Sequence, residues 1–170
     1  MKEINKILFI DTETGGLDPK YFDLLSIGFI LYDVNKKEIL EEGELYLKKS
    51  SYRIDYNALS VNKFDFSLIK QCGMDTLEIR TKIMSLIDQC DCIAGYCVSF
   101  DKVFLETQLD WEIRKPMLDL YSVVLQNELK SYKLTEICQY KGIIFESESH
   151  GALADIKATF RLFERYCERD

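Results

Sequence analysis

The sequence feature that most constrains the fold is an apolar run near the N-terminus that leads straight into acidic residues. Residues 6–11 are mostly apolar and end in an aspartate, which predicts a buried strand with a carboxylate at its end. Residues 24–33 predict a second strand, and residues 38–47 predict a third because apolar and polar residues roughly alternate there. Residues 35–37, Asn-Lys-Lys, are typical of a hairpin turn. This part of the chain is therefore expected to form a three-stranded antiparallel meander.

Helical and strand patterns alternate in the rest of the chain. Short apolar runs predict strands at residues 91–95 and 116–120. Helices are expected within residues 56–72 and at residues 75–89, 101–109, 121–128, 133–141 and 151–168. A meander followed by alternating strands and helices predicts an α/β fold with a mixed central sheet, in which the later strands pair in parallel and helices flank the sheet.

The composition fits one globular domain that spans residues 1–170. A chain of this length can bury a substantial core, and its 47% hydrophobic and 30% charged residues are typical of a soluble protein. The apolar runs are too short for a membrane span, and residues 1–6 do not resemble a signal peptide, so we expect a cytoplasmic protein with no membrane partner. The six cysteines include no Cys-x-x-Cys pair, which favours reduced thiols over disulfides or structural zinc.

The acidic balance of the chain restricts how it could bind nucleic acid. The formal net charge is −7, which disfavours a long non-specific binding track because phosphate contacts need Lys and Arg. The charge does not disfavour a site that grips one chain end through metal ions. The formal net charge includes the acids that would bind metals but not their cations, so it overstates how acidic the metal-bound protein is.

Two acids at the end of the first strand form the first candidate segment of a site. Asp11 and Glu13 stand two positions apart, so they share one face of the strand, about 7 Å apart along it. Gly15 and Gly16 follow, and glycine lets the backbone turn tightly with a positive φ and approach a ligand closely. The competing interpretation is a polar strand end closed by a turn, since an Asp-x-Glu pair alone is a weak signal.

A third acid, Asp101, is expected at the start of the helix at residues 101–109. Ser99 is expected to be the N-cap of this helix, which places the acid in the first turn, where the helix dipole favours a negative charge. Capping and dipole chemistry therefore explain Asp101 as well as catalysis does. Only the presence of the other acids favours a catalytic role.

The chain's single histidine, His150, stands five positions before Asp155. On a continuous helix this spacing separates two side chains by about 140°, so they converge only if His150 lies in a loop and the helix begins near Gly151. Leu153 and Ile156 indicate that this part of the helix is buried, where Asp155 needs a metal or a hydrogen-bond donor. The competing interpretation is an exposed histidine and a solvated aspartate. Four carboxylates and one histidine in three segments are typical of a two-metal phosphodiesterase.

The three segments together resemble the three motifs of the DEDDh family of 3′→5′ exonucleases, which includes the DNA polymerase III epsilon subunit, ribonuclease T and oligoribonuclease. Residues 9–19 resemble the first motif, residues 99–101 and 104–105 the second, and residues 150–155 the third. Weaker similarity lies at residues 58–62, 119–120 and 132–134. Each motif alone is common, but the three in this order are specific.

The second motif departs from the family pattern at one point. The family usually has His-Asn where this chain has Tyr96-Cys97. A cysteine is a poor hydrogen-bonding substitute for asparagine. We therefore expect substrate contacts to differ from the family pattern, while the metal ligands stay intact.

The resemblance implies an RNase H-like fold and a role for each motif residue. It implies that two divalent cations, Mg²⁺ or Mn²⁺, are held by four carboxylates: Asp11, Glu13, Asp101 and Asp155. It makes His150 the general base that takes a proton from water. Substrate contacts are implied for Thr14, Gly15, Leu17, Asn62, Phe100 and His150. For Leu17 and Phe100, ordinary core packing is the competing interpretation.

The function implied by the resemblance is 3′→5′ exonuclease action on single-stranded DNA or RNA, with release of nucleoside 5′-monophosphates. DNA is favoured over RNA as the substrate. The sequence does not fix the oligomeric state: among relatives of this kind some are dimers and others are subunits of a polymerase, so a homodimer and a polymerase partner are both left open. The alternative function is an exonuclease-like interaction domain of a polymerase or repair complex in which catalysis is dispensable, and a generic acidic α/β binding protein is a further alternative.

Overall fold

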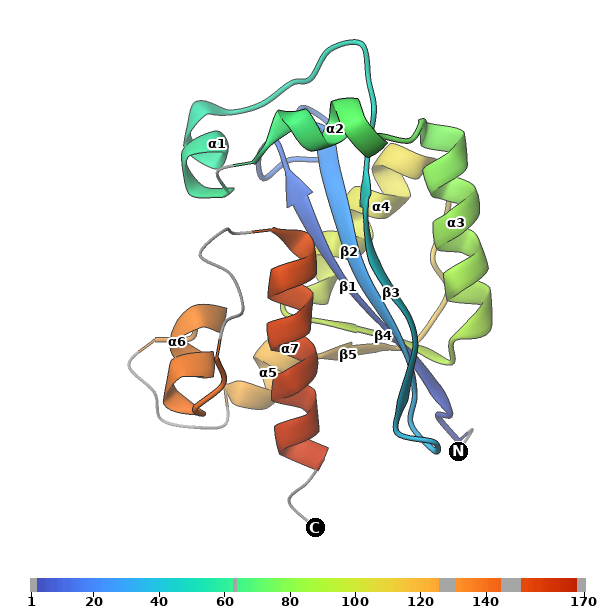
Figure 1. The fold of residues 1–170 in the computed structure, drawn as a ribbon, viewed down its shortest axis with the longest axis vertical. Coiled ribbons are helices and arrows are strands. Elements are labelled where there is room, and N and C mark those ends of the chain that lie inside the picture. The colour runs from blue at the N-terminus through green and yellow to red at the C-terminus, as the bar shows by residue number, and fades with distance from the viewer. Residues whose placement is uncertain (1–2, 63, 126–130, 145–150, 168–170) are drawn as a thin grey trace.

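A mixed five-stranded sheet forms the centre of the molecule (Figure 1). The computed structural model describes residues 3–62, 64–125, 131–144 and 151–167. The strands are β1 (Lys6–Thr14), β2 (Leu24–Asp33), β3 (Glu38–Tyr46), β4 (Cys92–Gly95) and β5 (Met117–Asp119). The first three pair antiparallel, whereas β4 pairs in parallel with β1 and β5, in the order β3-β2-β1-β4-β5. The predicted meander followed by parallel strands is confirmed.

Helices cover both faces of this sheet (Figure 1). They are α1 (Tyr56–Asn62), α2 (Phe66–Cys72), α3 (Thr76–Gln89), α4 (Val98–Leu109), α5 (Leu120–Val124), α6 (Leu134–Tyr140) and α7 (Ala152–Cys167). Residues 56–72 hold two short helices instead of the one expected, and the end of the helix predicted at 121–128 lies outside the described residues. Within the described ranges, no helix is both long enough and apolar enough to cross a membrane.

β1 separates two apolar cores because its side chains alternate between the two faces of the sheet. Leu8 and Ile10 pack on the face that α3 and α4 cover, whereas Ile7 and Phe9 pack on the face that α7 covers. The Phe9 ring meets Phe160 of α7 edge-on, with the ring centroids 5.2 Å apart. The end of β1, where the acids lie, is therefore held between two packed helical layers.

The N-cap predicted for the second-motif helix is wrong. α4 begins at Val98, so Ser99 lies inside the helix and Cys97 occupies the N-cap position. Cys97 adopts a left-handed conformation with a φ of 63°, and its N–H donates to Asp119 Oδ1 at 2.9 Å. The start of α4 is thus fixed by a contact to the end of β5, which a local capping pattern cannot reveal.

Candidate active site

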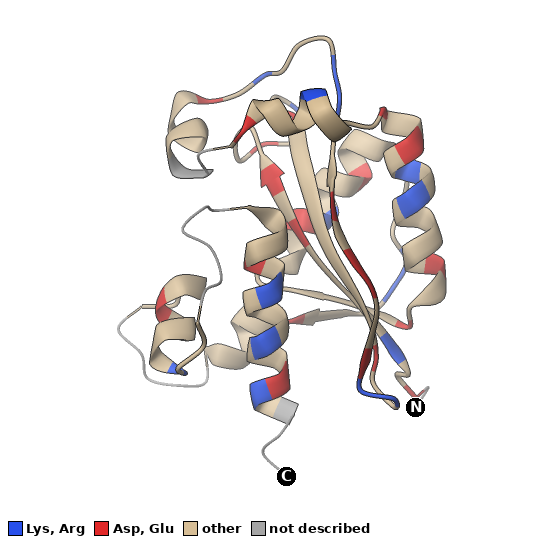
Figure 2. Ribbon diagram, in the orientation of Figure 1, with Lys and Arg blue, Asp and Glu red and all other residues tan. Residues whose placement is uncertain are grey.

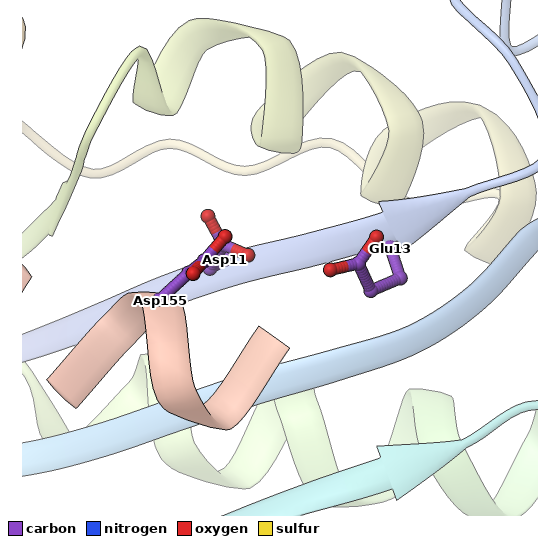
Figure 3. Close-up of side chains that lie close together, drawn as sticks. All are labelled: Asp11, Glu13 and Asp155. Carbon is purple, nitrogen blue, oxygen red and sulfur yellow. The ribbon is translucent and has the colours of Figure 1, made fainter. Parts of the chain in front are cut away.

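Three carboxylates from β1 and α7 converge at one end of the sheet. Asp11 and Glu13 share with Phe9 the face of β1 that α7 covers, and Asp155 lies in the first turn of α7. One carboxylate oxygen of each acid lies within 4.8 Å of the others (Figure 3). The structure therefore brings together three of the four predicted metal ligands, from segments far apart in the sequence.

A glycine on β2, the strand next to β1, lets α7 reach this position. Gly28 of β2 lies directly opposite Asp11 of β1. A Cβ atom on Gly28 would lie 2.3 Å from the carbonyl carbon and oxygen of Ala152 and 2.6 Å from the nitrogen of Leu153. The backbone of the first turn of α7 thus rests on the sheet where a side chain is missing, and this contact places Asp155 beside Asp11.

The fourth predicted ligand, Asp101, lies next to this group but is oriented by a neighbour on β1. Its carboxylate is 3% exposed, and its Oδ1 accepts a hydrogen bond from the Thr12 hydroxyl at 2.7 Å. Burial raises the pKa of Asp101 to about 7, against the lowering effect of the bond from Thr12 and with a further rise from Asp119. Asp101 is not among the three acids within 4.8 Å of one another, so it borders the group from the α4 side.

The acids of the site repel one another. Desolvation raises the pKa of Asp11 well above its ordinary value, and the neighbouring charges of Asp101, Asp155, Glu13 and Glu44 raise it further. A cluster of this kind favours a bound cation, which would compensate the repulsion and the lost hydration together. The donor set is made of carboxylate oxygens, which suit hard divalent cations.

Glu44 is a charged neighbour of the site that the sequence patterns did not identify. It lies on β3 opposite Gly28, in the same row across the sheet as Asp11. Its Oε1 accepts a hydrogen bond from the Ser26 hydroxyl at 2.7 Å. Glu44 could have been found only from the register of three strands, because no motif marks it in the sequence.

A cavity of about 520 Å³ opens beside the carboxylates. It is lined by Thr12, Glu13, Thr14, Gly16, Leu17, Phe22, Asp55, Asn57, Ala58 and Phe100. Leu17 is 85% exposed, so core packing is not its role. Phe100 packs on Phe104 of the same helix, with ring centroids 5.0 Å apart, and also borders the cavity. Thr14, Leu17 and Phe100, three of the predicted substrate contacts, therefore share one cavity.

The two glycines after β1 serve a purpose other than the one expected. Neither has a positive φ. A Cβ atom would lie 2.5 Å from the carbonyl oxygen of Arg53 at Gly15 and 2.4 Å from the ring of Phe22 at Gly16. The missing side chains thus make room for the chain's own packing, and Gly16, rather than Gly15, lines the cavity.

Two predicted contacts cannot be placed by the structure. His150 lies outside the described residues, and with it the expected convergence of His150 on Asp155. Asn62 is the last residue of α1, and its side chain lies outside the described part of the chain. Both assignments therefore remain predictions from the sequence motifs.

Comparison with known families identifies the class of the protein. The family model described as Exonuclease, RNase_T, matches residues 8–163, which is nearly the whole chain. This chain belongs to that DEDDh-type 3′→5′ exonuclease family. The carboxylates at the end of β1 and the first turn of α7 lie within the matched segment.

The relatives of this exonuclease are much longer proteins. The PolC-type DNA polymerase III of Mycoplasma genitalium is 25% identical over 163 residues, which cover 92% of this chain and 11% of the polymerase. E. coli Exonuclease I in complex with a dT13 oligonucleotide superposes with a TM-score of 0.80 at 22% identity, over 97% of this chain and 41% of that one. The zinc-bound Exonuclease I–ssDNA complex gives a TM-score of 0.83 at 22% identity, over 98% and 41% of the two chains. These structures confirm the RNase H-like exonuclease fold.

Proposed function

We propose that this exonuclease is metal-dependent and removes nucleoside 5′-monophosphates from the 3′ end of single-stranded nucleic acid, with DNA favoured over RNA. The observation that carries the proposal is the convergence of Asp11, Glu13 and Asp155 beside an apolar cavity. The cavity has a size typical of small-ligand sites. The preference for DNA is supported by the fold neighbour E. coli Exonuclease I, which was solved with a dT13 oligonucleotide.

The acidic group would hold two divalent cations, Mg²⁺ or Mn²⁺. Asp11, Glu13 and Asp155 would supply carboxylate oxygens from β1 and α7, and Asp101 would add a ligand from α4. When bound, such ions supply positive charge that stabilises the charge developing on the scissile phosphate. The chain's contribution is to hold these carboxylates in a fixed arrangement, since β1 lies between two packed layers and Thr12 orients Asp101.

The walls of the cavity would receive the last nucleotides of the strand. Leu17 from the loop after β1 and Phe100 from α4 offer apolar surfaces to the faces of the bases. Stacking of this kind tolerates any base, which fits an enzyme that removes nucleotides in succession. Thr14, at the end of β1, lines the same cavity next to the carboxylates.

Three further residues are assigned from the family resemblance. His150 would take the proton of the attacking water, because a neutral imidazole near pH 7 is a suitable general base. Asn62 would contact the terminal nucleotide, and so would Gly15, which stands between the cavity-lining residues Thr14 and Gly16. These roles are supported by the order and spacing of the motifs in a chain that the family model covers almost completely.

The distribution of charge supports binding at the end of a nucleic-acid chain rather than along its length. β3 carries Glu38, Glu41, Glu42 and Glu44, and the basic residues of α7 lie C-terminal to Asp155 (Figure 2). Cations at the acidic group would therefore supply the positive charge that the phosphate needs. The match to PolC-type polymerases supports a polymerase as the partner, with a second copy of the chain as the alternative assembly.

Mn²⁺ is expected to raise the melting temperature of the protein. A ligand that binds only the folded state stabilises it by about 2.7 kcal/mol at a hundredfold excess over Kd. In a domain of this size that corresponds to a rise of roughly 5–10 °C. Differential scanning fluorimetry of EDTA-treated protein with and without millimolar Mn²⁺ measures the shift, and Asp155→Asn is expected to lose most of it. Equal shifts in both proteins, or none in either, would contradict the assigned ligands.

In Mg²⁺, the wild-type protein is expected to shorten 5′-labelled single-stranded DNA from its 3′ end. His150→Ala is expected to slow this reaction by about 10²–10⁴-fold, the usual loss for a general base. Denaturing gels of a time course give the rates, an RNA of the same sequence gives the sugar preference, and circular single-stranded DNA, which has no 3′ end, is the control. Degradation of the circle, or an unchanged rate in His150→Ala, would refute the assignment.

A further inference from the structure

Two separate segments of the chain line the cavity. The loop between β1 and β2 contributes Gly16, Leu17 and Phe22, and the first turns of α4 contribute Phe100. The distance between this loop and α4 therefore sets the width of the cavity. The contacts that hold the β1–β2 loop against α4 therefore also determine how well the cavity fits a base.

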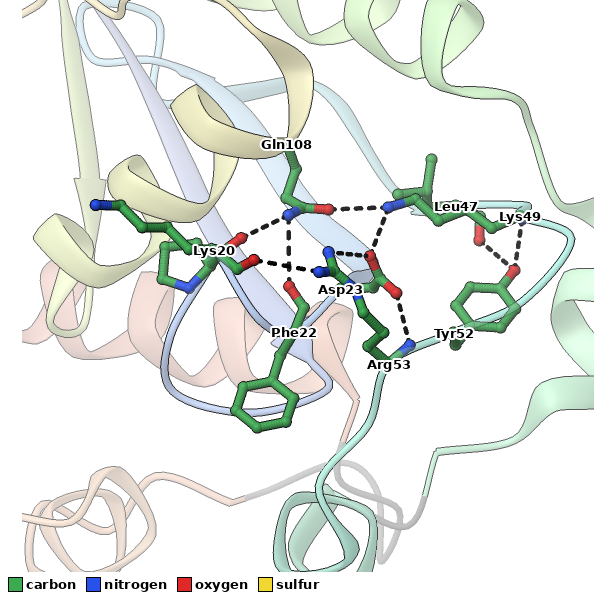
Figure 4. A network of polar contacts seen from close by, with 9 residues as sticks. Lys20, Phe22, Asp23, Leu47, Lys49, Tyr52, Arg53 and Gln108 are labelled. Carbon is green, nitrogen blue, oxygen red and sulfur yellow. Dashed lines mark hydrogen bonds and ion pairs between the residues drawn. The ribbon is translucent and has the colours of Figure 1, made fainter.

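A nearly buried carboxylate anchors the end of the loop. Asp23 is 4% exposed, and it accepts hydrogen bonds from the Lys49 ammonium at 2.8 Å and from the Arg53 backbone N–H at 2.6 Å (Figure 4). Burial alone would raise the pKa of Asp23, but these bonds outweigh it and lower the pKa, so the carboxylate is charged at neutral pH. Arg53 leads directly to Asp55 and Asn57, which line the cavity, so the anchor also fixes this third wall.

Gln108 connects the anchor to α4. Its amide Nε2 donates to the carbonyl oxygens of Pro19 at 2.7 Å and Phe22 at 3.4 Å, and its Oε1 accepts from the Lys49 ammonium at 2.9 Å (Figure 4). The partners dictate this amide orientation, because an ammonium only donates and a carbonyl only accepts. Gln108 stands seven residues after Asp101, about two helical turns along the same face of α4.

We propose that Gln108 is a positioning residue that sets the fit of the cavity to the 3′-terminal bases. It joins α4 to the loop and, through Lys49, to Asp23, so all three walls share one polar network. The inference rests on the proposed function. Gln108 is not among the residues that line the cavity or among the clustered carboxylates, so its loss should weaken substrate binding and leave the chemical step intact.

Two substitutions separate the contacts of Gln108. Gln108→Leu removes all of them, whereas Gln108→Glu keeps an acceptor for Lys49 and loses the donor to the loop carbonyls. Gln89→Leu is the matched control, because the Gln89 amide donates to the Ser85 carbonyl at 2.9 Å on the exposed surface of α3. KM and kcat are measured with a labelled single-stranded DNA in Mg²⁺. The Kd of the same oligonucleotide is measured by fluorescence anisotropy with Ca²⁺ in place of Mg²⁺, so that a divalent cation is present, below the melting temperature of each variant.

We expect KM and Kd to rise about fivefold or more in both Gln108 variants, with kcat within about twofold of wild type and no change in Gln89→Leu. Wild-type KM and Kd in a folded Gln108 variant, or a loss of kcat alone, would overturn the inference. If Gln108→Leu does not fold, the KM, kcat and Kd of Gln108→Glu test the inference. If the wild type binds DNA without cleaving it, the proposed function fails and Kd still decides the role of Gln108. If it neither binds nor cleaves, both fail.

Discussion

Asp11→Asn is expected to abolish exonuclease activity and, at the same time, to raise the melting temperature of the metal-free protein. Asp11 is surrounded by Asp101, Asp155, Glu13 and Glu44, whose charges raise its pKa in addition to the effect of burial. An amide removes one of the repelling charges and can donate to a neighbouring carboxylate, so the free energy of unfolding should rise by about 1–2 kcal/mol, which corresponds to roughly 2–8 °C in melting temperature. The same change removes a proposed metal ligand, and activity should fall by at least about 10³-fold.

Asp33→Asn provides the matched control for this prediction. Asp33 is also a buried acid, but it is the last residue of β2, and its Oδ1 accepts from the backbone N–H groups of Asn35 at 3.1 Å and Lys36 at 3.0 Å in the turn that follows. Its substitution should lower the melting temperature and leave activity unchanged. Thermal denaturation in EDTA and the single-stranded DNA assay measure both proteins. An Asp11→Asn variant that is active, or destabilised as much as Asp33→Asn, would show that Asp11 is a structural acid.

Much of the fold was predictable because its signals are local. The strand expected at residues 24–33 coincides with β2, since an apolar run between two turn-forming segments marks both of its ends. The helix expected from residue 101 in fact starts at Val98, because Asp119 fixes its first turn from another strand. Contacts of this kind depend on which strands become neighbours, and a pattern read along the chain carries no record of them.

The candidate site likewise contains residues that the sequence identifies and residues that only the structure reveals. Asp11, Glu13 and Asp155 were recognisable from motif spacing, and the structure brings them within 4.8 Å of one another. Glu44 and the hydroxyl of Thr12 were not recognisable, because Glu44 reaches the site through the register of β1, β2 and β3, and Thr12 of β1 reaches Asp101 of α4 through a contact between segments far apart in the sequence. Motif spacing therefore identified carboxylates that the structure brings together, and the structure adds the residues that orient or repel them.

Gly28→Ala is expected to lower the free energy of unfolding by about 3 kcal/mol, a large loss for a single methyl group. The added carbon would lie 2.3 Å from the Ala152 carbonyl. The atoms that it would meet belong to the backbone of Ala152 and Leu153, and they cannot move aside as a flexible side chain could. The first turn of α7 would have to shift away from the sheet, and Asp155 would move with it. Because a displacement of about 1 Å can cost about 10²-fold in rate, activity should fall along with stability.

Gly43→Ala separates this effect from the general cost of an alanine in a strand. Gly43 lies on β3, where an added carbon would meet only the ring of Phe29, at 3.2 Å. A ring can yield by a few tenths of an ångström, so this change should cost less than about 1 kcal/mol and leave activity intact. Urea denaturation of both variants, with the Mn²⁺-induced melting shift as a second measurement, tests the difference. If Gly28→Ala matches Gly43→Ala in stability and retains the Mn²⁺ shift, then α7 does not depend on this gap in the sheet for the placement of Asp155.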